Sequence, residues 1–327
     1  MDRRLDELLY ALMQNTMIAI SGEKLARDLA VSHSTLVRWV DKLREAGIEI
    51  RGELFTGYRL VRLPDVLLPQ LIRPRLRTTM MGRTLFHFYS VDSTNAFASR
   101  LLSHGRKVPE GTVIIAESQT AGRGRLGRSW HSEREAGLYF SVVLFPKVPP
   151  SLAPLFTLGT AVAMHNAVER YTGLDIDIKW PNDLLIDGKK FCGILSEIQA
   201  EVDRLQNMII GVGVNVNHES LPADISDRAT SLRIVSGRIQ SRIEILLEFF
   251  EEFENIYLDF ERKGPRSIIA QWSRHSSFAD GRRIEIHDGV RKISGITRGL
   301  NPLGALRIEQ KGGHIEEVYS GDVVKWE

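Results

Sequence analysis

The chain has 327 residues, of which 43% are hydrophobic and 26% are charged, and 43 Lys and Arg residues nearly balance 41 Asp and Glu residues. These values are typical of a globular protein long enough for two or three domains. The single cysteine, Cys192, excludes an internal disulfide and is expected to be a small buried side chain. The nine histidines lack the spacing of a zinc site and no Gly-x-Ser-x-Gly motif occurs, so we expect neither zinc chemistry nor serine hydrolysis.

The chain carries no sequence signal for a membrane. No apolar run approaches the roughly 18 residues that span a bilayer, and the charged residues 2–7 do not resemble a signal peptide. We therefore expect a cytoplasmic protein that does not contact membranes.

Residues 1–64 follow the pattern of three helices and a hairpin. The first helix is marked by leucines at helical spacing, namely Leu5, Leu8, Leu9 and Leu12. Ser21 and Ser32 stand where they can cap the second and third helices, and Gly47 ends the third. Residues 48–50 and 57–60 then bracket a turn. This order is typical of a winged helix-turn-helix, whose third helix enters the major groove of DNA.

On this interpretation the start of the third helix faces the bases of DNA. The expected DNA-binding residues are Ser32, His33, Ser34, Thr35 and Arg38, with Lys42 and Arg44 placed to reach phosphate. Ten Lys and Arg residues against nine Asp and Glu residues make residues 1–64 nearly neutral, so a basic DNA-binding surface must be local. A three-helix module that docks another protein has the same pattern and remains an alternative.

Residues 65–83 are rich in proline and arginine and are interpreted as a linker. Residues 84–272 read as an α+β domain with a largely antiparallel or mixed sheet. Strands are expected at 85–89, 112–116, 138–144, 176–180, 184–186, 191–198 and 208–214, and helices at 94–104, 151–171 and 241–263. Asp187-Gly188 is a strong hairpin turn between two of these strands.

Residues 122–130, Gly-Arg-Gly-Arg-Leu-Gly-Arg-Ser-Trp, hold three glycines, three arginines and no acid. Glycine lets backbone N–H groups approach an anion, and guanidinium groups fork onto phosphate or carboxylate oxygens. The spacing also fits the dinucleotide-binding motif and, apart from Arg128 in place of Lys, a P-loop. Both motifs need a helix directly after the loop, but residues 138–144 form another expected strand. We therefore interpret the loop as an anion clamp between two strands.

A second signal is the run Lys179-Trp180-Pro181-Asn182-Asp183, where Pro181 ends a strand and leaves Lys179 at the strand end. Taken alone, such a lysine is more often solvated than catalytic. After about residue 273 the chain changes to short strands separated by turns, at 283–286, 292–296, 306–309, 317–319 and 323–326. This change predicts a small β-barrel over residues 273–327.

These segments, with Ser93-Thr94-Asn95 and Gly211-Val212-Gly213-Val214-Asn215, resemble the biotin protein ligases in content, order and spacing over nearly the whole chain. The resemblance implies a catalytic domain of the biotin/lipoate ligase type over residues 84–272 and a small SH3-like barrel at the C-terminus. The winged helix over residues 1–64 marks the subset of the family that also represses the biotin operon. The resemblance therefore implies a ligase that doubles as a biotin-responsive repressor.

The reaction that the resemblance implies has two steps. Biotin carboxylate attacks the α-phosphate of ATP to give biotinyl-AMP, and a lysine amine of the biotin carboxyl carrier protein of acetyl-CoA carboxylase then expels AMP. Because two anions meet in the first step, cations must offset their repulsion. Lys179 is expected to bridge the two anions, Arg123 and Arg125 to hold the adenylate, and Arg128 to bind the β- and γ-phosphates.

The resemblance also assigns the remaining site residues. Besides Lys179, Arg123 and Arg125, the expected biotin site comprises Ser93, Thr94, Asn95, Gln119, Gly122, Gly124, Gly193 and Leu195, with Ser93 and Gln119 at the ureido ring. The expected nucleotide site adds Trp130 over the adenine, Asn215 at its edge, Asn182, and Arg298 from the last domain. Mg²⁺ is expected on the triphosphate with Asp183 as a candidate ligand, and the sequence gives Asn182 and Asp183 no firmer role.

The expected partners are the biotin carboxyl carrier protein and a palindromic operator DNA bound by a homodimer. Three alternatives remain open at this point. Lipoate ligases share the architecture and the adenylation step. The chain can also be a DNA-binding regulator whose second domain only senses an adenylate, or an unrelated nucleotide-dependent enzyme.

Overall fold

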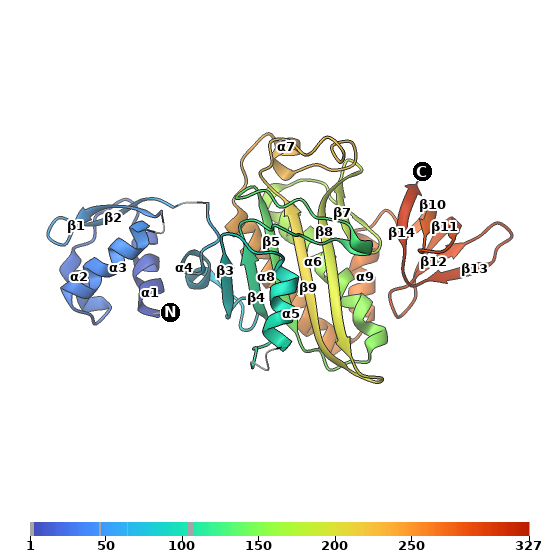
Figure 1. Ribbon diagram of the computed structural model, residues 1–327, viewed down its shortest axis with the longest axis horizontal. Coiled ribbons are helices and arrows are strands. Elements are labelled where there is room, and N and C mark those ends of the chain that lie inside the picture. Colours follow the sequence, from blue (N-terminus) through green and yellow to red (C-terminus); the bar gives the residue numbers. More distant parts are fainter. Residues whose placement is uncertain (1–2, 46, 64, 104–106, 327) are drawn as a thin grey trace. The chain divides into compact units, whose positions relative to one another are not determined.

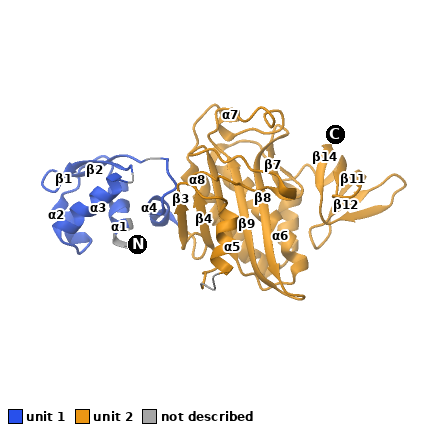
Figure 2. Ribbon diagram, in the orientation of Figure 1, with its two compact units in different colours: residues 1–76 blue, residues 77–327 orange. Residues whose placement is uncertain are grey.

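The computed structural model describes residues 3–45, 47–63, 65–103 and 107–326 (Figure 1). The chain divides into two compact units, residues 1–76 and residues 77–327 (Figure 2). Within the described ranges, none of the helices combines the length and apolar character needed to cross a membrane.

Unit 1 has the predicted order of three helices and a hairpin. Its elements are α1 (Arg3–Met13), α2 (Gly22–Asp28), α3 (His33–Glu45), β1 (Glu49–Glu53) and β2 (Gly57–Arg62), the two strands being antiparallel. The hydroxyl oxygens of Ser21 and Ser32 accept hydrogen bonds from backbone N–H groups three residues on, so both predicted caps are confirmed. Gly47 has a φ of 84°, and its N–H donates to the carbonyl of Arg44, which ends α3 as predicted.

The segment interpreted as a linker contains structure of its own. A short helix, α4 (Pro69–Ile72), runs into a 3₁₀ turn, η1 (Arg73–Arg75), and both contact α1. Leu67, Leu71 and Ile72 are fully buried. The boundary between the two compact units falls within this segment, after Leu76.

Unit 2 is built on a seven-stranded sheet with the order β3-β4-β5-β9-β8-β7-β6. Its strands are β3 (Leu85–Phe88), β4 (Thr112–Ala116), β5 (Gly137–Leu144), β6 (Asp177–Lys179), β7 (Asp183–Ile186), β8 (Lys189–Ala200) and β9 (Leu205–Asn215). Only β3 and β4 pair in parallel, and the other pairings are antiparallel. The mixed sheet expected from the sequence is therefore confirmed.

Helices cover both faces of this sheet (Figure 1). The helices of unit 2 are α5 (Thr94–Ser103), α6 (Ala153–Thr172), α7 (Leu232–Ser236), α8 (Arg242–Lys263) and α9 (Arg266–Arg274), with short 3₁₀ turns η2 (Arg125–Gly127) and η3 (Pro150–Leu152). Of these, α7 lies among loops at one end of the sheet (Figure 1). Consecutive side chains of a strand point to opposite faces. Ser141 of β5 contacts α5, whereas Phe140 packs against Phe249 and Phe250 of α8. Thus α5 and α8 lie on opposite faces of the sheet. The polar residues of α5 contact the face that is turned away from α8.

Glu254 of α8 fixes the beginning of unit 2. Its buried carboxylate accepts hydrogen bonds from the backbone N–H groups of Thr79, Met80 and Met81 and from the Thr79 hydroxyl. Burial by itself raises the pKa of Glu254, but these hydrogen bonds outweigh burial and hold the pKa below its usual value.

The last part of unit 2 is a five-stranded antiparallel sheet with the order β13-β12-β11-β10-β14. Its strands are β10 (Asp280–His287), β11 (Lys292–Leu300), β12 (Leu306–Glu309), β13 (Ile315–Val318) and β14 (Asp322–Trp326). The short antiparallel strands expected here are confirmed. Within the described part of the chain, the edge strands β13 and β14 do not pair to close the sheet into a barrel.

Candidate active site

The arginine loop, residues 122–130, folds back on itself between β4 and β5. The N–H of Gly124 donates to the carbonyl of Arg128 at 2.7 Å, and the N–H of Trp130 donates to the carbonyl of Gly122 at 2.9 Å. A Cβ atom at Gly122 would lie 2.6 Å from the Trp130 carbonyl oxygen, so only glycine allows this closure. The loop is followed by β5 and not by a helix, which confirms that it is neither a P-loop nor a dinucleotide-binding turn.

Two arginines of the loop are held by one carboxylate of β14. Arg125 Nη1 lies 3.1 Å from Asp322 Oδ1, and it also donates to the carbonyl of Gly321 and to the side-chain oxygen of Asn182. Arg128 Nη2 lies 2.7 Å from Asp322 Oδ2. Arg123 is exposed to solvent. The loop thus presents one outward guanidinium and two that converge on the last strand.

Lys179 ends β6, as the position of Pro181 predicted. Residues 179–183 form a tight hairpin in which Lys179 pairs with Asp183 of β7. The Lys179 ammonium lies 4.2 Å from the centre of the Trp326 ring, a cation–π contact. Burial lowers the pKa of Lys179, although the nearby Asp183 carboxylate acts in the opposite direction. Lys190 of β8 forms an ion pair with Asp183 at 2.6 Å.

A group of hydrogen-bonded polar side chains, which we call the polar pocket, lies where α5 meets the sheet. It comprises five side chains from α5, β5 and two loops: Ser93, Thr94, Asn95, Gln119 and Ser141. Ser141 Oγ donates to Thr94 Oγ1 at 2.7 Å or to Asn95 Oδ1 at 2.6 Å. The N–H of Thr94 donates to Gln119 Oε1 at 2.9 Å. Ser93, Thr94, Asn95 and Ser141 are all buried, so the pocket combines burial with many hydrogen-bonding groups.

A strip of glycines connects this pocket with the arginine loop. Gly211 and Gly213 share one face of β9, and Gly193 of β8 is paired with Gly213. A Cβ atom at Gly211 would lie 2.3 Å from Asn95 Oδ1, and one at Gly213 would lie 2.4 Å from the Trp130 ring. The absence of side chains therefore lets Asn95 and Trp130 lie directly on the sheet. The Lys190 ammonium also lies against the strip, 5.3 Å from the centre of the Trp130 ring, and a Cβ atom at Gly193 would lie 2.8 Å from Lys190 Nζ.

Four other predicted residues are engaged in contacts within the protein. Asn182 donates to the carbonyl of Ile194 at 2.7 Å, and Asn215 donates to the carbonyl of Thr230 at 3.1 Å. Leu195 offers its carbonyl oxygen to Asn95. The Arg298 guanidinium is paired with Glu309 at 2.6 Å and lies 3.5 Å from Asp280. The C-terminal sheet reaches the loop through Asp322, and the described contacts do not bring Arg298 there.

The sequence analysis missed four residues of this site: Ser141, Lys190, Asp322 and Trp326. Ser141 lies within an apolar strand, where an isolated polar residue that is buried is itself a signal. Asp322 and Trp326 lie far along the chain from the residues that they contact, so local spacing does not reveal them.

In unit 1, the first turns of α3 carry the residues predicted to contact DNA. His33, Ser34 and Arg38 are exposed. The Ser32 hydroxyl donates to Thr35 Oγ1 at 2.9 Å while it caps the helix. Arg44 differs from expectation, because its guanidinium donates to the carbonyls of Ile50 and Gly52 and thereby joins α3 to the hairpin.

Comparison with known sequences assigns a family to each of the three parts of the chain. Residues 4–59 match an HTH domain, residues 87–215 match the Biotin/lipoate A/B protein ligase family, and residues 281–326 match the Biotin protein ligase C terminal domain. The bifunctional ligase/repressor BirA of Bacillus spizizenii is 37% identical over 307 residues, which cover 93% of each chain. The chain belongs to the biotin protein ligase family. The BirA protein of Bacillus subtilis is 36% identical to this biotin protein ligase with the same coverage.

A solved structure extends this agreement to the fold. The biotin protein ligase from Aquifex aeolicus, in complex with biotin and ATP, superposes with a TM-score of 0.62 and 32% identity. The match covers 73% of this biotin protein ligase and 97% of the Aquifex aeolicus chain. An accidental resemblance is therefore excluded. The helix-turn-helix ahead of the catalytic domain makes this biotin protein ligase one of the bifunctional ligase/repressor type.

Proposed function

We propose that the chain attaches biotin to one lysine of a biotin carboxyl carrier protein in two steps. A biotin carboxylate oxygen attacks the α-phosphorus of ATP, pyrophosphate leaves, and a mixed anhydride forms. The lysine ε-amine of the carrier then attacks the acyl carbon, AMP leaves, and the amine loses a proton as the amide forms. With these reactants and a repressor role, we propose a cytoplasmic location.

The observation that carries this proposal is the cluster of cations around the hairpin of residues 179–183. Four cations from three parts of the chain gather around two carboxylates: Lys179, Lys190, Arg125 and Arg128 around Asp183 and Asp322. Four positive and two negative charges leave a local excess of two positive charges. Such an excess offsets the repulsion between a carboxylate and a triphosphate and stabilises the charge that develops between them.

Lys179 is the residue that we assign to the bridge between biotin carboxylate and α-phosphate. It stands at a fixed strand end, and its ammonium is partly removed from water, so its attraction to an anion is stronger than that of an exposed lysine. Arg123 and Arg125 are assigned to the adenylate, with Gly122 and Gly124 shaping the loop. Arg128, the most exposed of the paired cations, is assigned to the β- and γ-phosphates.

We assign the biotin ureido ring to the polar pocket, because this ring carries N–H donors and a carbonyl acceptor that need buried partners. Ser93, Thr94, Asn95 and Gln119 supply such partners. The glycine strip is the path from this pocket to Lys190 and the cationic cluster, with Gly193 and Leu195 beside it. Trp130 lies on the strip itself, so the valeryl chain of biotin and the indole use the same surface. We infer that the arginine loop moves when biotin enters.

The remaining assignments concern the nucleotide. Trp130 is assigned to one face of the adenine, and Asn215 to its edge once its bond to Thr230 is exchanged. Asn182 holds Arg125 in place rather than touching the nucleotide. Asp183 offers one carboxylate beside Lys179, which fits Mg²⁺, an ion that takes one or two carboxylates and completes its shell with phosphates and water. When bound there, Mg²⁺ would neutralise charge on the triphosphate.

Biotin-dependent exchange of labelled pyrophosphate into ATP tests the first step. Replacing Lys179 with alanine removes a fixed cation from a developing charge, a change that costs on the order of 3 kcal/mol. We therefore expect Lys179→Ala to lower the exchange rate by roughly 100-fold. Lys189→Ala is the matched control, since Lys189 is an exposed lysine at the start of β8, on the next hairpin, and its replacement should leave exchange unchanged. Equal rates in the two folded variants would remove Lys179 from the mechanism.

The same assay separates biotin from lipoate as the acyl substrate. A lipoyl group lacks the ureido donors that the polar pocket would satisfy, so we expect no lipoate-dependent exchange. If pyrophosphate exchange depends on lipoate and not on biotin, the acyl substrate is lipoate. The adenylation chemistry proposed above would still hold.

We also propose that a homodimer binds a palindromic operator upstream of biotin genes, with His33, Ser34 and Arg38 of α3 toward the bases. One nearly neutral winged helix binds DNA weakly, so useful affinity requires two copies on half-sites about one helical turn apart or a multiple of it. Arg38→Ala should weaken operator binding at least 10-fold and leave pyrophosphate exchange intact. A monomer that binds the operator as tightly as the dimer would contradict this arrangement.

A further inference from the structure

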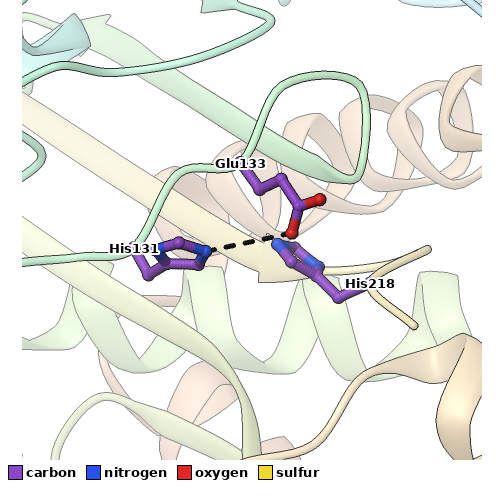
Figure 3. A group of neighbouring side chains, drawn as sticks. All are labelled: His131, Glu133 and His218. Carbon is purple, nitrogen blue, oxygen red and sulfur yellow. Dashed lines mark ion pairs between the residues drawn. The ribbon is translucent and has the colours of Figure 1, made fainter. Parts of the chain in front are cut away.

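Three potential metal ligands meet just beyond the arginine loop. His131 and Glu133 follow Trp130, and His218 follows β9 (Figure 3). One ligand atom from each lies within 4.8 Å of the other two, and His131 Nε2 is 3.9 Å from Glu133 Oε2. Their separation in the sequence hides the group, because His218 lies far along the chain from the other two. None of the three is used in the ligase chemistry proposed above.

His218 is held in the form that binds a metal. Its ring is 1% exposed, and Nδ1 has no hydrogen-bond partner among the described residues. The Tyr139 hydroxyl donates its only proton to the carbonyl of Glu133 at 3.0 Å, so the 3.2 Å contact between Tyr139 Oη and His218 Nε2 requires Nε2 to donate. Nδ1 then carries a lone pair. A metal-bound histidine typically donates its second N–H to an oxygen in this way.

The geometry suits a small tetrahedral ion. Zinc bonds of about 2.0–2.1 Å place neighbouring tetrahedral ligand atoms roughly 3.3 Å apart. The present atoms are therefore at most about 1.5 Å too far apart. His131 and Glu133 are exposed and can turn inward, whereas His218 is fixed. Side-chain rotation alone can close the site around the buried ring.

The electrostatic surroundings also allow a cation. Arg242, a buried cation whose charge acts on His218, is paired with the buried Glu117 at 2.8 Å. Glu133 contributes a negative charge.

We propose that His131, Glu133 and His218 form a binding site for one divalent transition metal, best matched by Zn²⁺, with the fourth position left to water or another ligand. Two imidazoles and one carboxylate with an open position form a set typical of zinc. Such an ion would join the segment after the arginine loop to the segment after β9. It would thereby restrict the motion of the segment that follows Trp130 and of the segment that follows Asn215.

Zinc binding to the full-length, chelator-treated protein tests this site without reference to ligase activity. Titration against a chromophoric zinc chelator should give one Zn²⁺ per chain. His131→Ala and Glu133→Gln each remove one ligand from an exposed position and should weaken binding by about 100-fold or more, while His314→Ala, at an exposed histidine elsewhere, should not. Tyr139→Phe should weaken binding by about 10- to 100-fold through the tautomer of His218.

Cobalt provides an independent readout of the ligand set. Co²⁺ in place of Zn²⁺ should give the visible absorption of a four-coordinate site without a thiolate charge-transfer band, because Cys192 is not a ligand. The proposal is overturned if the wild type does not bind Zn²⁺, if His131→Ala and Glu133→Gln bind it as tightly as the wild type, or if Cys192→Ser abolishes binding. In the first case the group is only a contact between His131 and Glu133 beside a buried histidine.

Discussion

Asp322→Asn removes the charge that joins the arginine loop to β14 while keeping the size of the side chain. The pair with Arg125 is mostly buried, with 22% and 16% of the two side chains exposed, so losing this charged hydrogen bond should cost about 1.5–3 kcal/mol. The pair with Arg128, which is 66% exposed, adds less than about 1 kcal/mol. A total near 2 kcal/mol corresponds to a roughly 30-fold shift of the loop toward its released state.

If this loop retains biotinyl-AMP, Asp322→Asn should release the adenylate roughly 30-fold faster. The assay forms labelled adenylate on the enzyme, adds excess unlabelled biotin and ATP, and follows the label that leaves the protein. Asp280→Asn is the control, since Asp280 is an exposed acid of the same sheet that lies 3.5 Å from Arg298. An unchanged release rate in a variant with unchanged thermal stability would refute the reasoning, because Asp322 would then not hold the loop over the intermediate.

Three further outcomes are expected. Glu254→Gln replaces one oxygen that accepts backbone N–H groups with an amide donor, and should lower the free energy of unfolding by about 2–4 kcal/mol at pH 7 in urea titrations. Because the folded pKa of Glu254 is depressed, its contribution is present above the unfolded value near 4.5 and is lost as the pH falls, so the loss of stability in acid should be smaller in the variant; a parallel pH dependence would contradict this. Gly213→Ala should displace Trp130 and slow pyrophosphate exchange at least 10-fold, and should add little to Trp130→Ala, whereas additive losses would place the indole elsewhere. Deleting residues 1–76 should leave a folded unit with exchange within about 10-fold of the wild type and without operator binding, and an insoluble product would mean that the two units do not fold independently.

Local pattern was sufficient for much of this fold. The strand at residues 112–116 has the predicted bounds, because a buried apolar run between polar turns has few other solutions. Ser32 and Gly47 similarly marked both ends of α3, since a cap depends on neighbours only a few residues away. The helix α9 was not predicted, because it is short and begins directly after Pro265 with only part of one face apolar.

The residues of the candidate active site were harder to predict from local sequence patterns than the fold was. The arginine loop and Lys179 were found through glycine content and a strand end, which are local features. The resemblance implied Arg298 as the nucleotide contact from the C-terminal sheet, and this role stays a prediction; Asp322 of β14, which contacts the loop in the structure, was not predicted. Which residue of a sheet faces another domain depends on tertiary packing, and neither composition nor periodicity encodes it.

The contact between Arg125 and Asp322 also has a consequence for when activity appears during synthesis. The two residues are 197 positions apart, and β14 pairs only with β10 at the edge of its sheet. Contacts of such long range form late in folding, since the intervening chain must be ordered first. A growing chain on the ribosome can therefore build the sheet that carries Lys179 well before Asp322 and Trp326 exist. Retention of biotinyl-AMP should therefore begin only after β14 has emerged and docked, and an incomplete chain should release any reactive anhydride that it makes.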